Sequence, residues 1–132
     1  MKYLHTMLRV KDLEKSLKFY QEGLGFRLVS RNDYPEDKFT LAFIAGSGDS
    51  HDGPLIELTH NWETDHYDRG DAYGHLAYGV GSIKAIQTRL REHGYDLSWG
   101  PGEAPRGTLR MAFVDDPDGY EIELLEEMKS RE

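Results

Sequence analysis

The sequence predicts an α+β protein built from two tandem βαβββ modules, because its two halves repeat one series of patterns. The segment HTMLRVKDLEKSLKFY from His5 resembles HLAYGVGSIKAIQTRL from His75, and in each an alternating strand leads into a helical pattern. TLAFI then matches RMAFV, and the Ala of each lies 37 residues after its His (42 − 5 and 112 − 75). LIELT finally matches EIELL. This common order predicts a duplication, with halves of about 1–66 and 67–132 forming curved, mixed sheets within one domain.

The first strand, residues 3–10, has two faces of different chemistry. Side chains of a strand alternate between its two sides, so His5 and Arg9 share one face with Met7. The other face consists of Leu4, Thr6, Leu8 and Val10. We expect the apolar face to join the core and the face of His5 to line a site.

A helix follows the first strand in each half. Asp12 and Ser82 are candidate N-caps, because their side-chain oxygens can accept hydrogen bonds from free amides of the first turn. Apolar residues then recur at helical spacing, and glycines suited to a left-handed cap end each pattern. The apolar positions are Leu13, Leu17, Tyr20 and Leu24, then Ile83, Ile86 and Leu90, and the glycines are Gly23, Gly25 and Gly94.

Three further strands complete each half. In order along the chain they are FRLVS (26–30), TLAFI (40–44), LIELT (55–59), YDLSW (95–99), RMAFV (110–114) and EIELL (121–125). The sequence DPDG at 116–119 places Pro and Gly where a type I turn favours them, directly before the last strand. The polar segment 60–74 connects the halves.

The composition argues against several classes of partner. The formal net charge is −8 without a basic run, which disfavours nucleic acid and anionic membrane surfaces. No apolar run approaches the ~20 residues of a membrane-spanning helix. The chain has no Cys, so it has no disulfide, thiolate ligand or cysteine nucleophile. We therefore expect a cytoplasmic protein, in which any metal is bound by His, Asp or Glu.

Each half contributes one His from its first strand and one Glu from its last. The pairs are His5 with Glu57 and His75 with Glu123. A partly buried imidazole can simply pair with a carboxylate. For each His taken alone, this explanation is as good as metal binding. The repetition favours a metal, because carboxylates between apolar neighbours are costly to bury unless they are paired or metal-bound. Two imidazoles, two carboxylates and two waters would suit Ni²⁺, Co²⁺, Mn²⁺ or Fe²⁺ better than a closed structural Zn²⁺ site.

Two polar residues extend the candidate site along the strands. Arg9 follows His5 by four residues and therefore lies on the same face, ~13 Å further along. Asn61 shares the face of Glu57 if its strand runs that far. Arg9 could bind a carboxylate of an extended anionic ligand through two hydrogen bonds. A surface salt bridge for Arg9 and a turn position for Asn61 explain each residue equally well when taken alone.

The motifs LHTMLRV, LAFI, IELTHNW, AYGH and AFVDDPDGYEIELLEE together resemble the glyoxalase I (lactoylglutathione lyase) family of the vicinal-oxygen-chelate superfamily. The similarity covers nearly the whole chain and is greatest to the short bacterial form. It implies a homodimer with metal sites between subunits, each taking His5 and Glu57 from one chain and His75 and Glu123 from the other. It also implies activation by Ni²⁺ or Co²⁺, with Zn²⁺ or Mn²⁺ as the other candidates.

The resemblance implies isomerisation of the hemithioacetal of methylglyoxal and glutathione to S-lactoylglutathione through an enediolate. Glu123 would remove the C1 proton, and Glu57 would serve the opposite face of the substrate. Arg9 and Asn61 match positions that hold the γ-glutamyl end of glutathione.

The glycyl carboxylate of glutathione is assigned to the loop PRGT, residues 105–108, where the family often has Lys-Gly-Gly. This loop is one residue out of step with the family pattern, and it offers Arg106 and Gly107. Asp71 stands where some members carry a basic residue.

Other functions of the same superfamily are the alternatives. Extradiol dioxygenases and thiol transferases to antibiotic epoxides use three protein ligands, whereas an epimerase could retain a fourth at Glu57. A metal-free drug-binding module would replace the ligand positions with apolar residues. All four positions are intact here, which favours the lyase.

Overall fold

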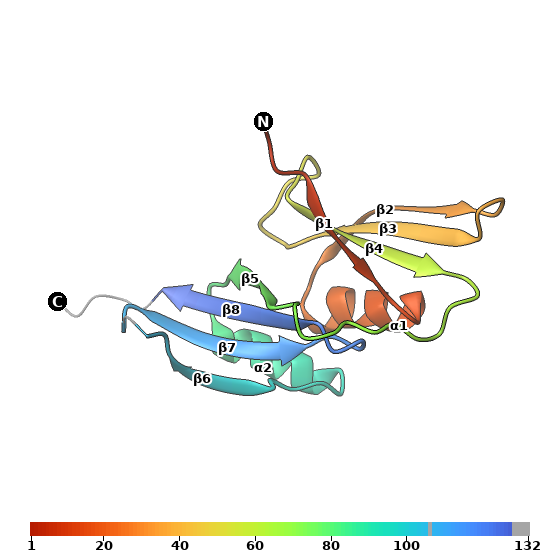
Figure 1. Ribbon diagram of the computed structural model, residues 1–132. Coiled ribbons are helices and arrows are strands. Elements are labelled where there is room, and N and C mark those ends of the chain that lie inside the picture. The colour runs from red at the N-terminus through yellow and green to blue at the C-terminus, as the bar shows by residue number, and fades with distance from the viewer. Residues whose placement is uncertain (106, 128–132) are drawn as a thin grey trace. The chain divides into compact units, whose positions relative to one another are not determined.

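The computed structural model describes residues 1–105 and 107–127 (Figure 1). The chain divides into two compact units, Met1–Arg69 and Gly70–Glu132, at a boundary inside the polar connecting segment. Each unit contains one four-stranded mixed sheet and the helix that follows its first strand. The predicted α+β class with two βαβββ modules is confirmed, and the grouping of both modules into one domain stays a prediction.

The first unit has a sheet of strand order β1-β4-β3-β2. Strand β1 runs parallel to β4, whereas β4–β3 and β3–β2 are antiparallel. Helix α1 contacts β4, and Figure 1 shows it on one side of the sheet. The elements are β1 (His5–Arg9), α1 (Leu13–Lys18), the π-helical segment η1 (Phe19–Gly23), β2 (Arg27–Tyr34), β3 (Phe39–Ala45) and β4 (Leu55–Asn61).

The second unit repeats this topology with the strand order β5-β8-β7-β6. Strand β5 runs parallel to β8, and the remaining pairs are antiparallel. Helix α2 contacts β7 and β8. The elements are β5 (His75–Gly79), α2 (Ile83–Glu92), β6 (Trp99–Glu103), β7 (Leu109–Asp115) and β8 (Glu121–Glu127).

Both helices begin where the sequence predicts. The Asp12 carboxylate accepts a hydrogen bond from the Lys15 amide at 3.1 Å, and the Ser82 hydroxyl accepts one from the Ala85 amide at 3.0 Å. Gly25 and Gly94 have the predicted positive φ angles, 77° and 86°, whereas Gly23 lies inside η1. Within the described part of the chain, no helix is long and apolar enough to cross a membrane.

Each unit has its own core between the helix and one face of the sheet. Ala42 and Ala112, which the repeat aligns, are both fully buried and lie opposite Leu58 and Leu124. Leu4 is an exception to the predicted apolar face, because it precedes β1 and is 57% exposed. The core includes Leu8, Val10, Leu13, Leu17, Tyr20, Ile44 and Ile56 in the first unit and Ile83, Leu90, Val114 and Ile122 in the second.

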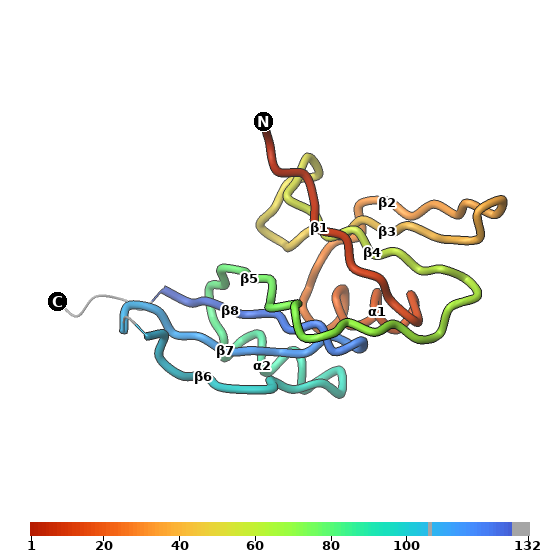
Figure 2. Tube along the Cα trace, in the orientation of Figure 1, coloured from red at the N-terminus to blue at the C-terminus, as the bar shows by residue number. Residues whose placement is uncertain are grey.

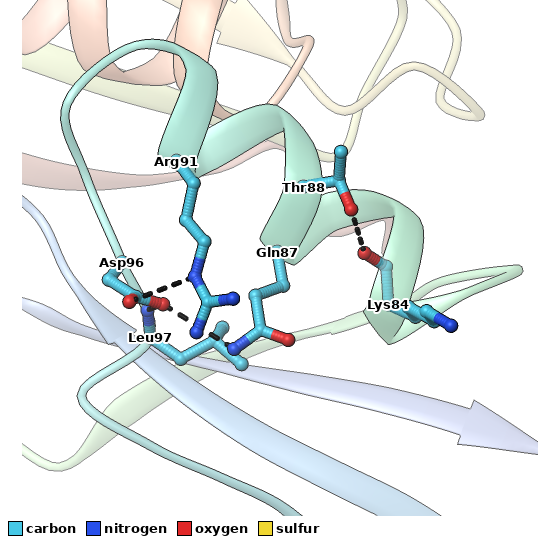
Figure 3. Close-up of polar contacts among 6 residues, drawn as sticks. All are labelled: Lys84, Gln87, Thr88, Arg91, Asp96 and Leu97. Atoms are coloured by element: carbon cyan, nitrogen blue, oxygen red, sulfur yellow. Dashed lines mark hydrogen bonds and ion pairs between the residues drawn. The ribbon is translucent and has the colours of Figure 1, made fainter.

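The strand predicted at 95–99 starts only at its last residue, since β6 begins at Trp99. Asp96 explains the difference: its carboxylate accepts from the Leu97 amide at 2.7 Å and from Arg91 Nε at 3.1 Å, as Figure 3 shows. The hydrogen bond from the Leu97 amide lowers the pKa of Asp96, and Arg91 and Gln87 add to the effect. The bond from Arg91 ties Asp96 back to the helix. The first hydrogen bond from this segment to β7 therefore comes from the Ser98 amide, which donates to the Phe113 carbonyl at 2.7 Å.

The loop 46–54 joins β3 to β4 and lies beside the N-terminal segment (Figure 2). The amide of Leu55 donates to the carbonyl of Leu4 at 3.0 Å. Gly53 has φ 108°, and a Cβ there would lie only 3.0 Å from the same carbonyl. Glycine therefore permits the close approach that aligns β1 with β4 at His5.

The turn before β8 depends on a buried carboxylate. Asp116 is 4% exposed, and its Oδ1 accepts from the amides of Asp118 and Tyr120, both at 2.9 Å. The Gly119 amide donates to the Asp116 carbonyl at 2.9 Å, which confirms the predicted turn. Asp116 thereby sets the point at which β8 begins.

Replacing Asp116 by Ala should lower the free energy of unfolding by about 2 kcal/mol, because two amide donors lose a charged acceptor. Asp115→Ala is the matched control: Asp115 is exposed, so its loss should change stability by less than about 0.5 kcal/mol. Urea unfolding of both variants measures the difference. Equal stabilities of the two variants would contradict this account of the turn.

Candidate functional site

The first His–Glu pair lies on adjacent parallel strands. In the register of β1 and β4, His5 is opposite Leu55 and Glu57 is opposite Met7, so the two side chains project from the same face, two residues apart along the strands. His5 Nε2 and Glu57 Oε2 are 2.8 Å apart. The imidazole is more exposed than the carboxylate, with side-chain exposures of 37% and 15%. The His5 and Glu57 side chains thus form a partly exposed pair on one face of the sheet.

The second pair has the same register on β5 and β8. His75 is opposite Glu121 and Glu123 is opposite Ala77. His75 Nε2 and Glu123 Oε2 are 3.7 Å apart, with side-chain exposures of 42% and 16%. Both predicted pairs are therefore brought together within their own units, and the two pairs have similar burial.

A phenylalanine supports each imidazole. Phe43 is the β3 partner of Glu57 and packs edge-on against His5, with ring centroids 5.4 Å apart. Phe113 is the β7 partner of Glu123 and packs similarly against His75 at 5.6 Å. These two residues were not among the candidates drawn from the sequence, although their matching positions in TLAFI and RMAFV were a signal. The aromatic edge restricts the rotation of each imidazole.

The two carboxylates differ in how they are held. Thr59 Oγ1 lies 3.4 Å from Glu57 Oε1 and donates to it, while Oε2 faces His5. The position that corresponds to Thr59 in the second module is Leu125, which has no polar side-chain atom to donate. Glu57 is consequently held at both oxygens, whereas Glu123 lacks this second restraint.

The donor chemistry fits a divalent first-row ion. Imidazole nitrogens and carboxylate oxygens without sulfur are ligands that such ions accept, and each pair brings one of each together, 2.8 Å apart in the first unit and 3.7 Å apart in the second. Within residues 1–105 and 107–127, no group of three or more His, Asp or Glu side chains forms a metal site. Each unit therefore brings together two of the four predicted ligands.

The structure extends the face of Glu57 as far as Asn61. Strand β4 reaches Asn61, which is opposite Phe39 and two alternations beyond Glu57. Asn61 Nδ2 donates to the Tyr67 hydroxyl at 3.0 Å. Arg9 is the last residue of β1, lies on the face of His5 and is exposed. Because β4 extends to Asn61, this residue shares the face of Glu57, as the sequence analysis required.

The predicted contacts for the glycyl end lie in the loop between β6 and β7. Gly107 is exposed with φ 69°, and its amide donates to the Ala104 carbonyl at 2.8 Å. Arg106 lies outside the described residues. Asp71, which departs from the family pattern, is exposed.

Tyr73 is anchored next to the second pair. Its hydroxyl donates to the Glu121 carbonyl at 3.1 Å, and its ring packs edge-on against Tyr120. Burial, followed by the nearby Asp116 carboxylate, raises the pKa of Tyr73 to about 12. The hydroxyl therefore remains a hydrogen-bond donor at neutral pH and holds the start of β8.

A cavity of about 470 Å³ lies on the other face of the first sheet, between the start of α1 and the strands. Its polar lining is internally bonded: Arg31 pairs with Glu14 at 2.7 Å, and Trp62 Nε1 donates to Thr40 at 2.8 Å. His60 also lines it and is half-buried, with Nδ1 3.3 Å from the Val10 carbonyl oxygen. This cavity includes none of the predicted metal ligands.

Comparisons with known proteins agree with the fold and with the motifs. The chain is 51% identical over 126 residues to the lactoylglutathione lyase of Neisseria meningitidis serogroup A, covering 96% of this chain and 91% of that protein. The trypanothione-dependent glyoxalase I of Leishmania major is 44% identical, with a TM-score of 0.79 over 96% of this chain and 86% of that one.

A binding protein shares the fold at lower identity. TnmS3, an antibiotic binding protein from Streptomyces sp. CB03234, is 28% identical with a TM-score of 0.71, over 97% of each chain. Residues 2–124 match the family model described as the Glyoxalase/Bleomycin resistance protein/Dioxygenase superfamily. With its duplicated βαβββ topology, the chain belongs to this superfamily.

Proposed function

We infer that this chain is an enzyme with lactoylglutathione lyase activity, which isomerises the hemithioacetal of methylglyoxal and glutathione to S-lactoylglutathione. The observation that carries this function is the duplicated His–Glu pair, in a chain 51% identical to a lyase of that name. A drug-binding module does not need such pairs. Removal of methylglyoxal by this reaction is a detoxification.

The metal site of the proposal consists of His5, Glu57, His75 and Glu123. Each module supplies one imidazole and one carboxylate, and we propose that two copies of the chain complete each site in a homodimer. Ni²⁺ or Co²⁺ suits this sulfur-free set, with Zn²⁺ or Mn²⁺ as the other candidates. A divalent ion bound there acts as a Lewis acid that stabilises negative charge on the substrate oxygens.

Glu123 is the proposed base. Its carboxylate takes the proton from C1 of the hemithioacetal, and the C–H electron pair becomes part of the enediolate. The same proton, or one from solvent, is returned to the C2 carbon. The proton of the C1 hydroxyl passes to the C2 oxygen, so the product has a thioester carbonyl at C1 and a hydroxyl at C2. No oxidant or reductant is consumed. Glu57 is bonded to Thr59, whereas Glu123 has Leu125 in the corresponding position, and this favours Glu123 as the carboxylate that moves to take the proton. Glu57 serves the opposite face of the substrate.

The γ-glutamyl and glycyl ends of glutathione are proposed to bind in different places, the first at strands β1 and β4 and the second at the loop between β6 and β7. Arg9 forms a charged contact with the γ-glutamyl carboxylate, and Asn61 supports it from the adjacent strand, held by Tyr67. Arg106 and Gly107 are proposed for the glycyl carboxylate. Because the Leishmania relative is described as trypanothione-dependent, the thiol is best identified with a panel that includes glutathione and trypanothione.

Removal of metal should abolish the activity. A chelator followed by desalting is expected to eliminate formation of the thioester from methylglyoxal and glutathione, and added Ni²⁺ or Co²⁺ should restore it more fully than Zn²⁺. Thioester absorbance measures the rate. Lack of activity with every divalent ion and every thiol of the panel would overturn the lyase and favour a binding protein.

Glu123→Gln should reduce kcat by about 10²–10⁴-fold, because the amide cannot accept the C1 proton. The variant should retain the wild-type thermal unfolding midpoint, since the amide has nearly the same size and shape as the carboxylate it replaces. Glu127→Gln, an exposed acid on the same strand, is the control and should keep the wild-type rate. A wild-type kcat for Glu123→Gln would refute its role as base.

Arg9→Met should raise KM for the hemithioacetal by about tenfold or more while changing kcat little, because the contact is equally present in the ground and transition states. Arg31→Met is the matched control, since Arg31 pairs with Glu14 away from the predicted ligands. Steady-state kinetics separates the two parameters. An unchanged KM in Arg9→Met would exclude Arg9 from the substrate site.

A further inference from the structure

His75 stands between two carboxylates on β8. Its Nε2 faces Glu123 Oε2 at 3.7 Å, and its Nδ1 faces Glu121 Oε1 at 3.8 Å. The two nitrogens of one imidazole point to different sides of the ring, so each faces its own carboxylate. The ring is thereby presented with Nε2 directed to the proposed metal-binding carboxylate and Nδ1 directed away from it.

The parallel register produces this arrangement. His75 on β5 is the Cα partner of Glu121 on β8, so their side chains leave the sheet on the same face and at the same level. In the first module the corresponding partner of His5 is Leu55, whose side chain cannot accept a hydrogen bond. The carboxylate beside Nδ1 is consequently a feature of the second module.

The backbone of Glu121 is fixed independently of its side chain. The Tyr73 hydroxyl donates to the Glu121 carbonyl at 3.1 Å, and Glu121 is the first residue of β8 after the Asp116 turn. The side chain is 43% exposed and can rotate. Closing the 3.8 Å separation to a hydrogen bond needs a movement of about 1 Å.

We propose that Glu121 is a positioning residue for His75: its carboxylate accepts the Nδ1–H, which fixes the tautomer and leaves Nε2 as the nitrogen available to the metal. This inference rests on the proposed metal site. An acceptor behind a ligating imidazole orients the ring and makes the opposite nitrogen a better donor. The two half-sites thus differ, because His75 has a carboxylate behind it and His5 has an aliphatic side chain in that position.

Metal affinity tests the proposal without reference to turnover. Calorimetric titration of metal-free protein with Ni²⁺ should show affinity falling by about 10–100-fold in Glu121→Leu, the range typical of such outer partners. Glu121→Gln should fall less, because its amide oxygen still accepts a hydrogen bond. Glu127→Gln removes the same charge from the same face of β8 and should bind Ni²⁺ as the wild type does. Equal losses in Glu121→Gln, Glu121→Leu and Glu127→Gln would show only a general charge effect and overturn the proposal.

The tautomer gives a spectroscopic readout on the metal-free protein. With ¹⁵N-labelled histidine, the His75 resonances should show the Nδ1–H form in the wild type, at a pH about two units above the ordinary imidazole pKa of ~6.5. Glu121→Leu should shift the population toward Nε2–H, the form that predominates in free imidazole side chains. An unchanged tautomer in Glu121→Leu would overturn the proposal.

The wild type separates the two hypotheses. Wild-type protein that binds no metal and lacks lyase activity would overturn the proposed function. Wild-type protein that binds Ni²⁺ and turns over, together with wild-type affinity and tautomer in Glu121→Leu, would overturn the positioning role of Glu121 alone.

Discussion

The parallel pairing of the first and last strands in each module is the constraint on which the site depends. Side chains of paired residues on adjacent parallel strands leave the sheet on one face. His5 on β1 and Glu57, two residues beyond the β4 partner of His5, therefore lie next to each other on that face. The same register between β5 and β8 places His75 beside Glu123. Shifting either pairing by one residue would turn the Glu into the core and an apolar neighbour out to solvent.

The repeat supplies equivalent His–Glu pairs but not equivalent surroundings. Glu57 is restrained by Thr59, whereas the corresponding Leu125 leaves Glu123 without that bond. Arg9 has Gly79 as its counterpart, because Thr59 pairs with Arg9 and Leu125 with Gly79. A symmetrical set of ligands therefore lies among asymmetrical neighbours. This asymmetry suits an isomerase, in which ligand binding can be shared while one carboxylate moves a proton.

The cores and turns keep this surface in place. The buried alanines Ala42 and Ala112 lie in the two cores, opposite Leu58 and Leu124, on the face of each sheet away from the His–Glu pairs. Gly53 permits the approach that aligns β1 with β4, and Asp116 starts β8 at a defined residue. The members of each His–Glu pair lie on adjacent strands whose positions are fixed by the ladder of hydrogen bonds.

The repeated modules, the helix caps and the two His–Glu pairs could all be predicted from the sequence, because alternation, capping and duplication are patterns of neighbouring residues. The sequence did not reveal where β6 begins, since Asp96 is held by Arg91 and Gln87 of the preceding helix. Nor could it place Phe43 and Phe113 beside the imidazoles, or Glu121 at Nδ1 of His75. Those contacts are decided by register between strands far apart in the chain, and only the tertiary structure sets that register.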